Sequence, residues 1–197
     1  MNYFKKGMSF KDNDGFIDLR MMRPIIVLDE KNNSSHLLQP TSEIKLGNDN
    51  VTFCSPNIVS LFVSIAKKEL EDAKVIFNKS IHLKITKSKN VDFEKEENKL
   101  LFNYFEKIGI SIVAIYTAVE ALANIAIPND YKLEKMNKKK VIEIWNKQNI
   151  ERWICTTEKI GDIIPEIMHI ESPKKLKIWS YFKSLEEMRN YIRVSAK

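Results

Sequence analysis

The chain has 197 residues, of which 44% are hydrophobic and 29% charged, a composition typical of a soluble globular protein. With only 5 Gly and 6 Pro, it is not a loop-rich, fibrous or low-complexity chain. Cys54 and Cys155 lie far apart, and the three scattered histidines have no partner at ligand spacing. We therefore expect no metal and no other cofactor.

The net charge of +6 is concentrated near the end of the chain. The last 24 residues hold seven basic side chains and two acidic ones, a net charge of +5, whereas the other residues hold 25 basic and 24 acidic side chains. A local basic surface suits a polyanionic partner. A solvated Lys-rich helix has the same composition, so both interpretations stay open.

Residues 1–54 predict a small β-rich appendage with little core of its own. The runs FIDL and PIIVL are β-prone. The segment EIKLGNDNVTF alternates apolar and polar residues on both sides of 47–50, which predicts a hairpin with a four-residue turn. We expect LDEKNNSSHLLQPTS to be a polar connector.

Residues 55–197 carry helical periodicity. A first helix is predicted from Ser55-Pro56, because Ser is a good N-cap and Pro suits the first turn. The segment SIHLKITKSKN fits either a helix tail or a loop with a short strand. A long helix should then begin near Asn90 or Asp92 and end at Pro128.

The second half of that long helix, residues 108–127, is apolar nearly all round and long enough to span a bilayer. Glu120 near its middle would cost about 2.5–3.5 kcal/mol in a membrane, and a helix buried in a bundle explains the same pattern. The N-terminus has no apolar run of signal-peptide length, because Lys11, Asp12 and Asp14 interrupt it. We expect a cytoplasmic protein without a membrane segment.

The remaining segments predict more helices. The run YKLEKMNKKK should be a charged connector, and VIEIWNKQNIERWI fits either a strand or a helix. Thr156 or Thr157 can cap a further helix, which Pro165 should kink. The pair Ser172-Pro173 begins the last helix in the way that Ser55-Pro56 begins the first.

Arg189 stands out on that last helix. Spacings of four and three lead from Ile178 through Phe182 and Leu185 to Arg189, so the guanidinium should face inward with the apolar stripe. A buried guanidinium is unfavourable unless it is paired and hydrogen-bonded. Arg189 should therefore have a partner or line a cleft.

The long helix offers such a partner in Glu120. It lies on a polar stripe with three and four spacing, formed by Thr117, Glu120 and Asn124. An inward Glu and an inward Arg suit a bidentate pair, which Glu186 and Asn190 can complete. An ion pair that only fixes helix register explains the same residues, and this alternative stays open.

Three segments resemble bacterial proteins with a HEPN-type helical domain: AIYTAVEALANIAIP, IERWICTTEKIGDIIPEI and SPKKLKIWSYFKSLEEMRN. The resemblance covers residues 50–193. That superfamily is a helical bundle whose hallmark is Arg, often followed by Asn, and then His on a late helix, and Arg189-Asn190 match the start of this motif.

The resemblance implies metal-independent RNA cleavage in the shared cleft of a homodimer. In that family the Arg helps to hold the phosphate, and the His assists attack by the ribose 2′-OH. Many such proteins act as toxins or in phage defence, which implies RNA and an antitoxin or defence-system protein as partners.

The motif His is absent, because Val194, Ser195 and Ala196 occupy its place and none titrates near neutral pH. Three explanations stay open: a non-catalytic relative that kept the Arg, a truncated chain whose parent carried the His, or an imidazole from His82 or His169. The final helix has no Gly, Asn or Pro stop signal, as expected of a truncated chain.

We therefore predict a mainly α protein, with a HEPN-like helical bundle over 55–197 and a β-rich appendage over 1–54. The predicted function is that of an RNA-associated domain, a degenerate or weakened ribonuclease of the toxin or defence type. The alternative is a non-enzymatic helical interaction module with Arg189 and Glu120 as a structural pair. The candidate site residues are Arg189 and Asn190 for catalysis, Lys183, Arg193 and Lys197 for phosphate binding, and Thr117, Glu120, Asn124 and Glu186 as a supporting network.

Overall fold

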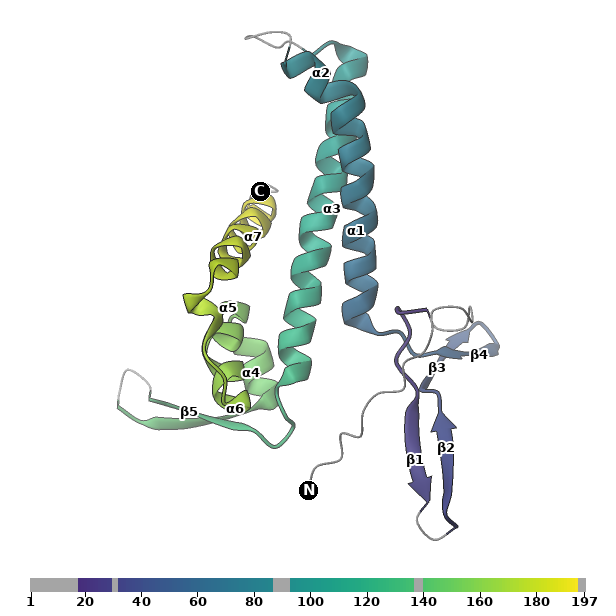
Figure 1. The fold of residues 1–197 in the computed structure, drawn as a ribbon, viewed down its shortest axis with the longest axis vertical. Coiled ribbons are helices and arrows are strands. Elements are labelled where there is room, and N and C mark those ends of the chain that lie inside the picture. Colours follow the sequence, from purple (N-terminus) through teal and green to yellow (C-terminus); the bar gives the residue numbers. More distant parts are fainter. Residues whose placement is uncertain (1–17, 30–31, 87–92, 137–139, 195–197) are drawn as a thin grey trace. The chain divides into compact units, whose positions relative to one another are not determined.

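The computed structural model describes residues 18–29, 32–86, 93–136 and 140–194. The chain divides into two compact units, Met1–Leu61 and Phe62–Lys197, which are treated separately below. The described residues are mostly helical, with a small β-hairpin region in the first unit (Figure 1). The predicted mainly α chain with an N-terminal β appendage is thus confirmed at this level.

The first unit contains two hairpins with largely exposed strands. Strands β3 (Thr41–Leu46) and β4 (Asp49–Cys54) form the predicted hairpin, with Leu46 opposite Asp49. Its turn has two residues rather than the predicted four, and Gly47 at the first of them has a φ of 64°. A positive φ at that position favours glycine and lets the short turn follow the twist of the strands.

The second hairpin corrects the prediction of a polar connector. Strand β1 (Ile25–Asp29) pairs with β2 (Ser34–Leu38), and β2 lies within that segment. Asn33, next to β2, has a φ of 48°, which Asn tolerates better than most residues. Of the predicted strand FIDL, Phe16 and Ile17 lie outside the described residues, and Leu19 is in a turn.

Helix α1 (Ile58–Ile76) is capped by Asn57 and not by Ser55. The Asn57 side chain accepts a hydrogen bond from the Ser60 amide at 3.1 Å. Ser55 instead shares a hydrogen bond with the Ser42 hydroxyl at 2.8 Å. The ambiguous segment that follows is helical, as a π-helical turn η1 (Phe77–Ile81) and a short helix α2 (His82–Ile85).

Helix α3 (Lys95–Ala126) is the long helix predicted from the sequence. Glu94 is its N-cap and forms a capping box with Glu97, while Asn90 and Asp92 lie outside the described residues. Within the second unit, α3 runs antiparallel to α1 (Figure 1), and the Ser111 hydroxyl donates to the Ala66 carbonyl at 2.9 Å. By length and composition alone, α3 could cross a membrane.

The segment after α3 forms a third hairpin, where a charged connector was predicted. Strand β5 (Lys132–Met136) pairs with β6 (Ile142–Asn146), which continues into α4 (Lys147–Trp153). The segment VIEIWNKQNIERWI, which fitted either a strand or a helix, therefore contains one of each, β6 followed by α4. Asn146 caps α4 by accepting from the Asn149 amide at 3.0 Å.

The next helical segment is interrupted where Pro165 was expected to kink it. Helix α5 (Thr156–Glu158) widens into the π-helical turn η2 (Lys159–Ile163), and α6 (Ile164–Met168) follows. Proline has no amide hydrogen to donate to the preceding turn, so the wider turn accommodates it. The N-cap of α5 is Cys155 without a side-chain hydrogen bond, so the predicted Thr cap was wrong.

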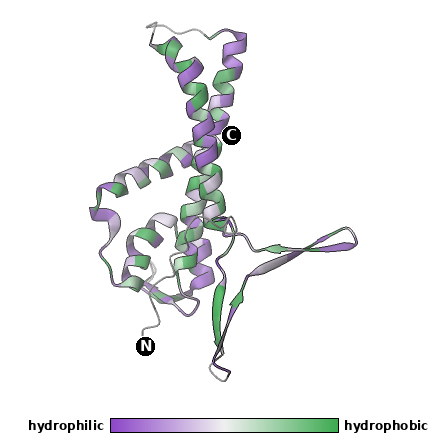
Figure 2. Cartoon of the chain, turned by 45° about the vertical axis from the view of Figure 1, so that its right-hand side comes forward, coloured by the Kyte–Doolittle hydropathy of each residue, from purple (hydrophilic) through white to green (hydrophobic). Residues whose placement is uncertain are grey.

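The main core lies where α3 ends, among Ile127, Ile150, Ile154 and Ile163. The last elements are η3 (Pro173–Lys175) and α7 (Lys177–Val194). Ser172 was predicted to begin the last helix, but it caps η3, and α7 begins only at Lys177. Hydrophobic and hydrophilic residues alternate along the helices in Figure 2. Many apolar side chains outside this core remain exposed. Both cysteines are free and exposed, with Cys54 in the first unit and Cys155 in the second.

Candidate functional site

Arg189 lies on α7, where this helix packs against α3. Its side chain is half-buried, and the guanidinium carbon lies 4.0 Å from the centre of the Tyr116 ring. The predicted inward direction of Arg189 therefore holds, but its neighbour is an aromatic face. A cation–π contact attracts the positive charge to the ring without requiring hydrogen bonds from the N–H groups of the guanidinium.

Tyr116 is the residue around which this site is organised. Only 3% of it is exposed, and its ring stacks on Phe182 at 6.3 Å between centroids with an interplanar angle of 10°. Its hydroxyl donates to Glu186 Oε1 at 3.1 Å. Burial raises the pKa of Tyr116, so the phenol stays protonated at neutral pH and acts as a donor.

Glu186 receives the remaining polar contacts of the cluster. Thr157 donates to its Oε1 at 2.5 Å, and Lys183 forms an ion pair with its Oε2. Burial raises the pKa of Glu186, but the hydrogen bonds from Lys183, Thr157 and Tyr116 outweigh this effect and lower the pKa overall. The carboxylate is thus ionised and already satisfied by these donors.

No described side chain forms an ion pair or a hydrogen bond with Arg189. The pair expected between Arg189 and Glu120 is not formed, because the Tyr116 ring, one helical turn before Glu120, occupies the face of the guanidinium. Glu120 interacts electrostatically with Lys159 instead. Burial lowers the pKa of Lys159, and the negative charge of Glu120 opposes this effect.

The other members of that stripe have local partners. Thr117 donates to the Val113 carbonyl at 2.8 Å, within its own helix. Asn124 Oδ1 accepts a hydrogen bond from Lys159 Nζ at 2.8 Å. Neither residue contributes to the Arg189 cluster, although both were predicted to.

Lys159 is a buried charge that the sequence interpretation missed. Only 1% of it is exposed, and besides Asn124 it donates to the Glu151 carbonyl at 2.9 Å. This carbonyl is in the last turn of α4, where a cation is favourable. Burial lowers the pKa of Lys159 against the opposing charge of Glu120. Lys159 lies three residues after buried Thr156 and four before buried Ile163. The same helical spacing identified Arg189, so the sequence pattern could also have identified Lys159 as an inward-facing cation.

Of the other predicted site residues, Lys183, Asn190 and Arg193 lie on α7. Lys183 is paired with Glu186, and Asn190 is exposed. Arg193 is in α7, but its side chain, like the whole of Lys197, lies outside the described residues. Val194 is the last residue of α7, and Ser195 and Ala196 are also outside.

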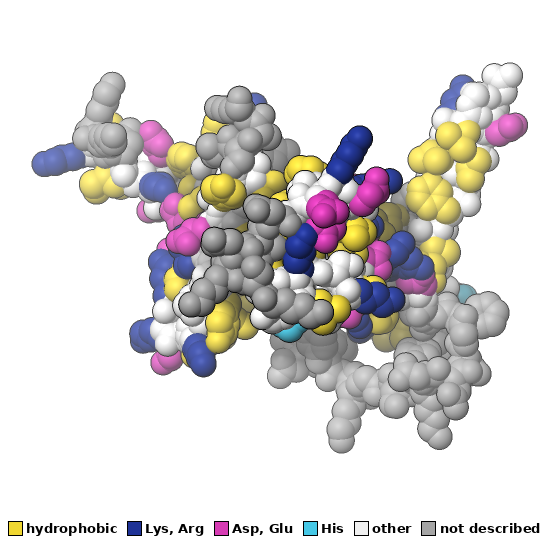
Figure 3. All heavy atoms as spheres, turned by 90° about the horizontal axis from the view of Figure 1, so that it is seen from above, with side chains coloured by type: hydrophobic (Ala, Val, Ile, Leu, Met, Phe, Trp, Pro, Cys, Tyr) yellow, Lys and Arg dark blue, Asp and Glu magenta, His cyan; other side chains and the backbone are white. Residues whose placement is uncertain are grey.

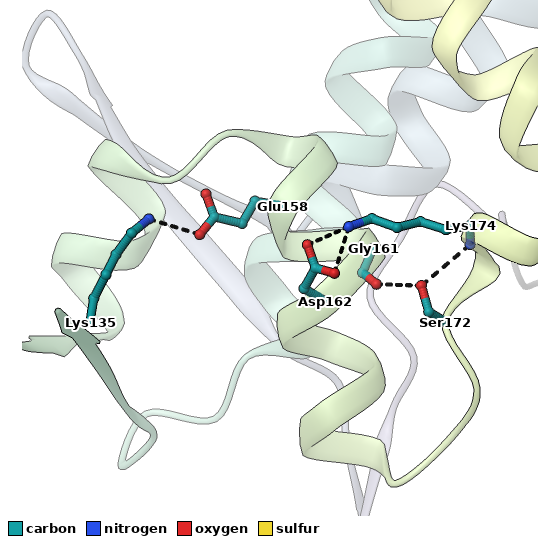
Figure 4. A network of polar contacts seen from close by, with 6 residues as sticks. All are labelled: Lys135, Glu158, Gly161, Asp162, Ser172 and Lys174. Atoms are coloured by element: carbon teal, nitrogen blue, oxygen red, sulfur yellow. Dashed lines mark hydrogen bonds and ion pairs between the residues drawn. The ribbon is translucent and has the colours of Figure 1, made fainter.

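A second polar network ties η2 to η3 and to its cap residue Ser172 (Figure 4). Lys174 Nζ contacts both carboxylate oxygens of Asp162, at 2.6 and 2.7 Å, and Ser172 donates to the Gly161 carbonyl at 2.5 Å. A Cβ on Gly161 would meet the end of the Lys174 side chain and lie 3.0 Å from Trp179. Glycine thus allows the close approach that positions Trp179 and α7.

An apolar pocket of about 420 Å³ opens beside the Tyr116 cluster, between α3, η2, η3 and α7. Phe182, which stacks on Tyr116, is also part of its wall. Among the described residues, no group of three or more His, Cys, Asp or Glu side chains could hold a metal ion.

No family model, curated protein or solved structure matches the chain. Function is therefore inferred from the residues of this chain alone.

Proposed function

We propose that this chain is a HEPN-like, RNA-associated helical protein of the toxin or defence type, in which Arg189 binds an RNA phosphate. The observation that supports this proposal is the guanidinium over Tyr116, half-exposed and with no described carboxylate partner. A guanidinium edge is well suited to bidentate contact with phosphate oxygens. Arg193 and Lys197, which follow Arg189 along the chain, would extend the contact along the RNA backbone.

The proposed activity is binding, with cleavage weak or lost. Attack by a ribose 2′-OH needs a group that takes up its proton near neutral pH. The Tyr116 phenol keeps its proton because burial raises its pKa, and Lys159 is sealed from solvent. The His82 ring packs against the Phe77 ring, in the part of the helical unit around η1. We further propose a cytoplasmic homodimer with no membrane segment.

The test is an anisotropy titration of fluorescein-labelled single-stranded RNA in EDTA. Arg189→Ala should weaken binding about tenfold or more, because a hydrogen bond to a charged group contributes about 1.5–3 kcal/mol. Arg189→Lys should recover only part of this loss, since ammonium cannot bind in a bidentate way.

Arg152→Ala is the matched control. Arg152 also lies over an aromatic ring, that of Trp153 at 4.9 Å, but it is on α4 and away from the cluster. Equal losses from Arg152→Ala and Arg189→Ala would contradict the proposal. Samples from each titration, run on a denaturing gel, score cleavage, and cleavage that depends on Arg189 would make the protein an active ribonuclease.

A helical interaction module remains the second candidate, and the apolar pocket favours it. In that case Arg189→Ala should lower thermal stability while leaving RNA affinity unchanged. The version of this hypothesis in which Arg189 and Glu120 form the structural pair is not supported, because no ion pair joins them.

A further inference from the structure

The pocket beside the Tyr116 cluster has the form of a groove between two helices. Side chains of α3 and α7 line it, together with Ile160 of η2 and Pro173 of η3. Its wall is almost entirely apolar and includes Leu122, Ile160, Pro173, Ile178, Phe182 and Leu185. A groove between two packed helices is a common receptor for the apolar face of a third helix.

Apolar side chains continue beyond the pocket on both sides. Leu122 of α3 is 55% exposed and Ile178 of α7 is 64% exposed, and Ile125 and Met188 extend the two rows. On the face drawn in Figure 3, hydrophobic side chains likewise lie open between charged ones. A continuous apolar surface of this kind, with charged residues at its margin, is typical of a site for a partner.

The charges at the margin indicate the kind of partner. Lys175 and Lys177 are exposed, flank Leu176, and make no ion pair with a described side chain. They adjoin Pro173 and Ile178 of the wall, whereas Lys174 is already held by Asp162. A second copy of the chain would bring the same lysines into a symmetric contact, where like charges repel.

We propose that this groove docks an amphipathic helix of a partner protein, with an apolar face and acidic flanking residues. Apolar side chains at helical spacing would fill the pocket beside Leu122 and Phe182, and carboxylates would meet Lys175 and Lys177. This inference does not depend on RNA binding, because Arg189 is not part of the pocket wall.

The experiment uses fluorescein-labelled peptides of about 16 residues, roughly 24 Å of helix. One peptide carries Leu at positions i, i+3, i+4 and i+7 with Glu between them. The second replaces each Glu with Lys, and the third scrambles the first. The full-length protein should bind the acidic amphipathic peptide with a Kd of about 1–100 µM and the other two at least tenfold more weakly.

Paired variants distinguish peptide binding in the groove from non-specific hydrophobic binding. Leu122→Ser and Ile178→Ser should each weaken binding about tenfold, as expected of an anchor position. Leu100→Ser is the control, since Leu100 is also an exposed leucine of α3 but is not part of the pocket. Lys175→Glu with Lys177→Glu should weaken binding, and the same reversal of the exposed Lys67 and Lys68 of α1 should not.

Three results would overturn the proposal. The first is no binding of the acidic peptide below about 1 mM. The second is equal binding of the acidic and basic peptides, or equal effects of Leu122→Ser and Leu100→Ser. The third is a dimer in light scattering that Leu122→Ser dissociates, because a second copy would then fill the groove. If the protein binds RNA as proposed but does not bind the acidic peptide, the inference about the groove is refuted and the proposed RNA binding is not.

Discussion

Two cations on apolar helical stripes, Arg189 and Lys159, are accommodated in different ways. The guanidinium of Arg189 lies over the Tyr116 ring and stays half-exposed, which a weakly hydrated group can do at little desolvation cost. The ammonium of Lys159 is sealed and needs two oxygens, from Asn124 and Glu151. At the residue scale, the first cation remains available to a ligand and the second serves the fold.

Replacing Lys159 by Met should lower the free energy of unfolding by about 1–3 kcal/mol at neutral pH, because two buried oxygens lose their donor. The pKa of Lys159 is lowered in the folded state, so the unfolded chain binds more protons below the ordinary value of 10.5. Wild-type stability should therefore gain from this residue as pH rises toward 10.5, and the Met variant should lack that gain. Urea unfolding at several pH values measures both.

The control for Lys159→Met is Lys68→Met, at an exposed lysine of α1. It should change neither the stability nor the pH dependence by more than about 0.5 kcal/mol. A Lys159→Met variant as stable as the wild type, with the same pH profile, would show that the hydrogen bonds of Lys159 do not contribute to the fold.

At the scale of elements, the sequence predicted the apolar-periodic helices α1, α3 and α7 and one of the three hairpins. It missed β2 and β5 because their runs, SSHLL and KLEKM, are polar, and their pairing depends on a partner strand. The cap of α1 was placed two residues early, since Ser55 and Asn57 both fit the pattern and only tertiary contacts decide between them. Helix ends are the least certain feature of such patterns.

The candidate site was predicted in part. Periodicity placed Arg189 inward correctly, because the direction of a side chain follows from helical geometry. Its neighbour could not be inferred in the same way, because the contact of α7 with Tyr116 rather than Glu120 depends on the relative axial position of two helices. For the same reason, the sequence could not show that Glu186 accepts hydrogen bonds from Tyr116 and Thr157.

Gly161→Ala should destabilise the protein by about 1–2 kcal/mol through overpacking against Lys174 and Trp179. The loss should be smaller in a Lys174→Ala background, where one of the two contacts is gone. Gly109→Ala in α3 is the matched control, because no atom lies within 4 Å of its added Cβ. That change should stabilise α3 by up to about 1 kcal/mol. Thermal melts compare the four variants, and equal effects at the two glycines would contradict the close packing of η2.

At the scale of the whole molecule, the salt dependence of RNA affinity should reflect a small number of phosphate contacts. Binding through Arg189 and two or three of the residues Lys183, Arg193 and Lys197 predicts a slope of log K against log salt of about −2 to −3 on single-stranded RNA. Arg189→Ala should reduce the magnitude of this slope by about 0.7. Anisotropy titrations between about 50 and 200 mM salt measure the slope. A slope of about −6 or steeper would mean that the chain, with its net charge of +6, binds through a wider basic surface.

The two free cysteines give this molecule a built-in pair of reporters. Cys54 belongs to the first unit and Cys155 to the second, and both thiols are exposed. Nitroxide spin labels can therefore be attached to the unmodified chain, one to each unit, and Cys54→Ser or Cys155→Ser provides the singly labelled reference. Pulsed dipolar spectroscopy would then give the distance distribution between the hairpin unit and the helical unit, for the free protein and with RNA or peptide added.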